Sequence, residues 1–160
     1  MNNTDALLNH LEANAREELA AQERFLALLD EQEQAIIGGS SEAVADVSKR
    51  LEKETPSAAR RSTTRARLVK AIAEAWQVPI GAMTLGSIAE RAGRHGERLS
   101  LLRDELRNKA NEVGRKNRRV ASVARLHHQV IREVINTIFR DDEGGYLDGE
   151  AAGTLIDAEA

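Results

Sequence analysis

The 160-residue sequence contains no cysteine, which excludes disulfide bonds and thiolate metal sites. Only four side chains are aromatic, and no run alternates aromatic or β-branched with polar residues as a strand would. No apolar stretch approaches the ~20 residues that span a bilayer. Residues 1–5 are polar and lack the basic and apolar regions of a signal peptide. We therefore expect a cytoplasmic protein without membrane insertion.

The apolar residues are mainly alanine, leucine, valine and isoleucine, and with glutamate, arginine and glutamine they favour long helices. Apolar residues at three- and four-residue steps predict a first helix over 4–37, which the Gly38-Gly39 pair ends. Ser40 and Ser41 then cap a second helix. At Pro56 this helix either kinks or gives way to a new one, and the pattern continues to Trp76. A short glycine link favours an antiparallel hairpin.

A loop at 77–81 and a short helix capped by Thr84 precede the longest element, which we expect over 97–139. Two rows of residues spaced by about seven define its apolar stripe, which indicates coiled-coil-like packing. The rows are Leu99, Leu106, Val113, Val120, His127 and Val134, and Leu102, Ala110, Asn117, Ala124, Ile131 and Ile138. The predicted fold is an all-α, elongated antiparallel helical bundle or hairpin with a long C-terminal helix.

Charge is segregated along the chain. Residues 1–37 hold two basic and eight acidic side chains, whereas residues 77–140 hold thirteen basic and six acidic ones. Residues 141–160 hold seven acidic side chains, no basic one and little apolar content. We expect a helical domain over 1–140 and a disordered acidic tail over 141–160, which is free to visit the basic helix.

No pattern of catalytic or cofactor-binding residues is present. No serine lies in a nucleophile-elbow motif, and the glycines lack a Walker lysine pattern. His127 and His128 are adjacent, so on a helix they point about 100° apart and cannot share a metal ion. We expect no enzyme, no metal and no cofactor.

The run at 115–119 carries four positive charges that could neutralise phosphates, but no aromatic residue is interleaved for base stacking. A solvated or intramolecularly paired face is the favoured interpretation, and nucleic-acid binding is the less favoured one.

The stripe of the long helix continues beyond the point where shorter elements could cover it. Either the fold doubles back and covers the end, or an open groove receives an amphipathic helix from a partner. The predicted groove residues are Val120, Ala124, His127, Ile131, Val134 and Ile138. Asn117, a polar residue within the stripe, would fix the register of helix pairing. Tyr146 is either an ordinary tail residue or an aromatic anchor in a short docking motif.

Several segments together resemble the FlgN family of flagellar type III export chaperones. The resemblance covers nearly the whole chain, and its C-terminal part is the more distinctive. The matching segments are Leu7-Leu8, Leu11, Leu19 and Leu28-Leu29 in the first helix, 34–38 and 41–44 at the turn, 67–69, Ala73, Val78-Pro79 and Thr84-Leu85 in the middle, Asn117 through Ile138 in the long helix, and 146–149 and 155–158 in the tail.

The resemblance implies a chaperone that covers the C-terminal helices of the hook-associated, or hook-filament junction, proteins and delivers them to the type III export gate. It further implies that Tyr146 docks on the cytosolic domain of that gate. The alternative function is a structural or regulatory coiled coil that self-associates, as a homodimer, through the same stripe.

Overall fold

A computed structural model describes the backbone of residues 3–144 and the side chains of residues 3–139. It contains four α-helices and two short 3-10 helices over that range, and no strand. Their bounds are α1 Asn3–Ile37, α2 Ser41–Trp76, η1 Ile80–Ala82, α3 Leu85–Arg91, η2 Gly93–His95 and α4 Gly96–Gly144. The expected all-α fold with a long C-terminal helix is therefore confirmed.

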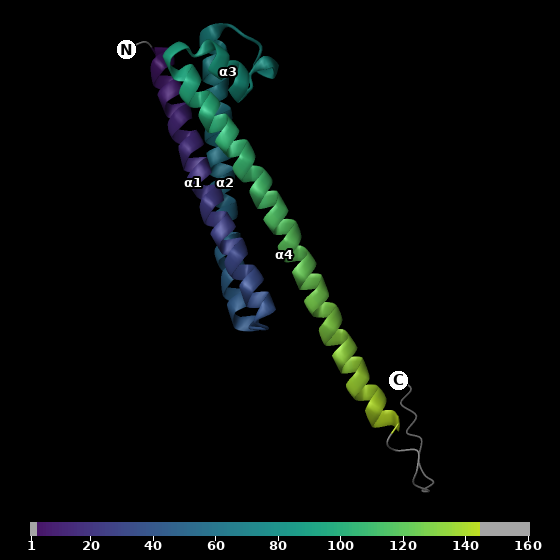
Figure 1. Ribbon diagram of the computed structural model, residues 1–160. Coiled ribbons are helices and arrows are strands. Elements are labelled where there is room, and N and C mark those ends of the chain that lie inside the picture. Colours follow the sequence, from purple (N-terminus) through teal and green to yellow (C-terminus); the bar gives the residue numbers. More distant parts are fainter. Residues whose placement is uncertain (1–2, 145–160) are drawn as a thin grey trace, which may run out of the picture.

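Helices α1 and α2 form an antiparallel hairpin, and α4 runs beside α1 and continues far past the turn of that hairpin (Figure 1). The turn has the predicted glycine geometry, because Gly39 adopts a φ of 67°, which a residue with a side chain rarely does. The Ser40 hydroxyl accepts a hydrogen bond from the Ala43 amide at 3.2 Å and caps α2 as expected.

Helix α2 passes through Pro56 without interruption, which answers the question that its sequence leaves open. Proline provides no amide hydrogen to the carbonyl of Glu52, four residues earlier. Both Glu52 and Pro56 lie on the exposed face of α2, so that carbonyl can hydrogen-bond water instead.

Helix α4 is longer than its sequence predicts. It starts at Gly96, one residue before the expected position, and continues to Gly144, four residues into the predicted acidic tail. The acidic residues 141–143 disfavour a helix C-terminus but do not break the backbone. The boundary expected at residue 140 therefore falls inside α4.

Two apolar clusters hold α1 against its neighbours. One lies at the end of the bundle that carries α3, where Ile72, Ile88 and Leu99 are completely buried against α1. The other lies near the hairpin turn, where Val120 of α4 packs against Leu29 and Ile36 of α1. The buried members of both clusters are aliphatic, and Trp76 and Phe25 pack against them as partly buried residues.

Candidate docking surface on α4

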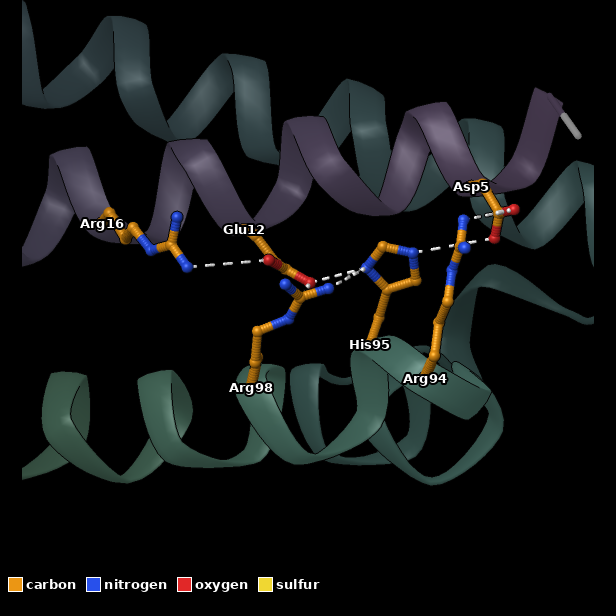
Figure 2. Close-up of polar contacts among 6 residues, drawn as sticks. All are labelled: Asp5, Glu12, Arg16, Arg94, His95 and Arg98. Carbon is orange, nitrogen blue, oxygen red and sulfur yellow. Dashed lines mark hydrogen bonds and ion pairs between the residues drawn. The ribbon is translucent and has the colours of Figure 1, made fainter. Parts of the chain in front are cut away.

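The start of α4 is fixed to α1 by a group of polar side chains (Figure 2). His95 and Glu12 are 1% and 4% exposed, and His95 Nδ1 lies 2.7 Å from Glu12 Oε1. Arg94 adds a hydrogen bond to Asp5 at 2.9 Å, and Arg98 approaches Glu12 at 3.5 Å. Because a buried carboxylate needs partners, this group fixes where α4 begins along α1.

The first half of α4 packs on α1 through two rows of residues. The row of Leu99, Leu106, Val113 and Val120 is buried or half-buried, as its seven-residue spacing predicts. The second row differs from the prediction, because Ala110 and Asn117 are exposed. Leu102 is buried as predicted, but after it the packed residues lie one position before the predicted ones, and they are Lys109, Lys116 and Val123.

The second row differs because the stem of a lysine can pack on apolar surface while its ammonium group reaches a carboxylate. Lys116 does this: its ammonium group pairs with Asp30 and with Glu33 of α1. The prediction that Asn117 lies in the packed stripe and sets its register is therefore wrong. The polar pair between the packed helices is Lys116 and Glu33.

Glu33 is 2% exposed, and it receives a second hydrogen bond from Arg119 Nε at 2.5 Å. The hydrogen bond from Lys116 lowers the pKa of Glu33 most, and Arg119 lowers it further, against the opposing effect of burial. The same contacts account for two of the four cations in the basic run 115–119. The intramolecular pairing expected for that run is thus present at Lys116 and Arg119.

Beyond Val120 the stripe changes from buried to exposed. Val120 itself is 5% exposed, so its placement in an open groove is wrong: Leu29 and Ile36 of α1 cover it. By contrast, Ile131 and Val134 are 47% and 52% exposed. The exposed apolar row, as we call it here, comprises Ala124, Ile131, Val134, Ile135 and Ile138.

A groove of about 850 Å³ opens where this row passes the turn of the hairpin. We call it the tip groove. Gly39 brings the turn close to His127, since a Cβ built on this glycine would lie 4.0 Å from the imidazole Cε1. The tip groove is lined on α4 by Ala124, His127, His128, Ile131, Arg132 and Ile135, and on the hairpin chiefly by Ala35, Ile36, Ser41, Val44 and Ala45.

Three of the six predicted groove residues, Ala124, His127 and Ile131, thus lie together in the tip groove, and Val134 and Ile138 lie in the exposed apolar row. Ile135 was missed, although its four-residue step from Ile131 marks the same face. The hairpin residues could not be found from sequence, because only the fold brings the turn to α4. Tyr146 lies outside the described residues.

Among the described residues, no group of three or more histidine or acidic side chains is suited to hold a metal ion. None of the described helices combines the length and the apolar character that crossing a membrane requires.

Comparison with known proteins places this arrangement in a family. A family model described as "FlgN protein" matches residues 1–149. No curated protein matches the chain. No solved structure matches it either.

Proposed function

This chain belongs to the FlgN family, and we propose that it binds the C-terminal helical segments of hook-filament junction proteins in the cytoplasm. The family is one of flagellar export chaperones, and that general role is the role of this chain. The particular cargo, the site that holds it and the delivery to the export gate are the parts that we propose.

The observation that carries the proposal is the exposure of the apolar row on α4. Ile131, Val134, Ile135 and Ile138 are 46–60% exposed, and Phe139 beside them is 66% exposed. Such a contiguous apolar face on a surface helix typically marks a binding site. An amphipathic helix that lays its own apolar stripe along this row would bury both surfaces.

The tip groove would anchor one end of the cargo helix, since the hairpin supplies a second wall there. Burial of apolar area contributes about 25 cal/mol per Å², from which the ordering of a flexible cargo segment must be subtracted. Affinity is therefore limited, and release does not require nucleotide hydrolysis. No cofactor is part of the proposal.

Delivery to the export gate is assigned to the acidic tail. We propose that Tyr146 is the aromatic anchor that contacts the cytosolic domain of the gate, with the neighbouring acidic residues steering the encounter. The resemblance of 146–149 to the tail of the family supports this role.

The test is a titration of purified C-terminal segments of the hook-filament junction proteins of the same organism into the chain. The variant Ile131→Asp with Val134→Asp should abolish binding, because both changes place a charge in the apolar row. Leu101→Asp is the matched control, since Leu101 is 58% exposed on α4 but outside the row. Unchanged binding to the double variant would remove the proposed site.

The same exposed row also favours a second candidate, self-association as a coiled-coil homodimer. Two copies that paired along α4 would bury residues 124–138 and leave no surface for cargo. Light scattering separates the two candidates. A stable dimer that the Ile131→Asp and Val134→Asp changes convert to monomer would favour self-association over the chaperone site.

A further inference from the structure

A row of three arginines runs along α4 beside the exposed apolar row. Arg118, Arg125 and Arg132 are seven residues apart, so they share one face of the helix. All three are exposed, and none forms an ion pair with a described side chain. Arg125 donates a hydrogen bond only to the Ser122 hydroxyl, at 3.1 Å.

This basic row borders the tip groove. Arg132 is one of the groove residues, as are His127 and His128. The acidic side chains Asp30 and Glu33 of α1 do not pair with this basic row, because they already pair with Lys116. The groove therefore combines apolar walls with a cationic rim that lacks a described partner. An acidic segment that also carries aliphatic side chains fits this chemistry.

The chain itself contains such a segment directly after α4. Residues 145–160 hold four acidic side chains and no basic one, together with Leu147, Leu155 and Ile156. The distance along the helix axis from Gly144 back to Ile135 is about 14 Å. The twelve residues from 145 to 156 can extend about 40 Å, so Leu155 and Ile156 can reach the tip groove.

We propose that residues 145–160 dock in the tip groove of their own chain. Leu155 and Ile156 lie against Ile131 and Ile135, and the carboxylates of the segment lie beside Arg125 and Arg132. The covalent connection makes this occupant favourable over a second copy, because a segment joined to its site by a short length of chain has an effective concentration in the millimolar range. The docked segment covers the apolar surface until another amphipathic helix displaces it.

A single spin label tests the placement, since the chain has no cysteine to remove. A nitroxide on Ala158→Cys in the full chain should reduce the amide NMR intensities of residues 41–45 and 124–135 at low salt. The reduction should disappear when Arg125→Glu and Arg132→Glu are combined. Arg115→Glu is the control and should keep it, because Arg115 is exposed ten residues before Arg125 and faces away from the exposed apolar row.

Three results would overturn the proposal. The first is intensity loss confined to amides next to Gly144. The second is loss at the groove that survives the double charge reversal. The third comes from a mixture of two chains, one carrying only the isotope and the other only the nitroxide. Intensity loss on the isotope-labelled chain would mean that a second copy is the occupant. Cargo binding by a chain that ends at Gly144 is a separate measurement, so failure of the chaperone site and failure of tail docking are distinguishable.

Discussion

Val120 and Val134 provide a matched test of where the stripe on α4 changes from core to surface. They lie two heptads apart in the same row of the same helix, yet they are 5% and 52% exposed. Replacement by alanine removes the same atoms at each site. The change at Val120 should destabilise the protein, and the change at Val134 should leave its stability almost unaffected.

The magnitude follows from burial. Loss of two buried methyl groups at Val120 costs about 1.6 kcal/mol of transfer free energy, and the cavity that remains between Leu29 and Ile36 adds about 1 kcal/mol. The better helix propensity of alanine returns about 0.5 kcal/mol. The net loss is about 2 kcal/mol, which lowers Tm by about 4–8 °C in a chain of this size.

At Val134 about half of the transfer loss applies, and the helix propensity of alanine offsets it, so the change should stay within about 0.5 kcal/mol. Urea and thermal unfolding followed by far-ultraviolet circular dichroism measure both variants. Equal destabilisation at the two positions would contradict this prediction, because it would mean that the end of α4 is packed in solution as firmly as its middle.

Two further predictions concern the polar pair and the junction before α4. Because the pKa of Glu33 is lowered in the fold, its contribution to stability is present above about pH 4.3 and is lost as pH falls through the folded value. The urea midpoint of Glu33→Gln should therefore lie below that of the unchanged chain at pH 7, and the gap should close in acid; a gap independent of pH would contradict this. Gly96→Ala should lower the free energy of unfolding by about 1–3 kcal/mol, because its Cβ would lie 2.5 Å from the carbonyl oxygen of Ala89. Gly81→Ala is the control. A Cβ there would have nothing within 4 Å, so the same unfolding measurement should show no change.

The helices and their caps could be predicted from sequence because their signals are local. The seven-residue spacing, the Gly38-Gly39 pair and the capping hydroxyls act within a few residues of where they stand. The continuity of α2 through Pro56 could not be predicted, because a helix accommodates an internal proline more readily where the freed carbonyl faces water, and that depends on which face packs.

The packed face of α4 could be predicted only in part. A seven-residue repeat defines the first row of packed residues. Each residue of the second row can lie either three or four positions after a residue of the first row. Apolar preference favoured Ala110, and a seven-residue step from it placed Asn117 in the row. The fold uses Lys109 and Lys116 instead: Lys116 pairs with Glu33 of α1, and Lys109 pairs with Glu112 of α4 itself. That choice depends on Glu33, 83 residues away along the chain.

The same limit applies to the candidate site. The exposed apolar row could be recognised from spacing, but its starting point could not. Val120 belongs to the core only because α1 reaches it, and Ala124 belongs to the tip groove only because the hairpin turn ends there. The buried pair of Glu12 and His95 likewise carries no signal in the sequence, since no short spacing relates the two residues.

We propose that the exposed apolar row on α4 holds cargo. Calorimetric titration of a hook-filament junction C-terminal segment into the chain, into the variant with Ile131→Asp and Val134→Asp, and into Leu101→Asp tests it most directly. The chain and Leu101→Asp should bind the segment, and the double variant should not. Equal affinity for all three proteins would contradict it.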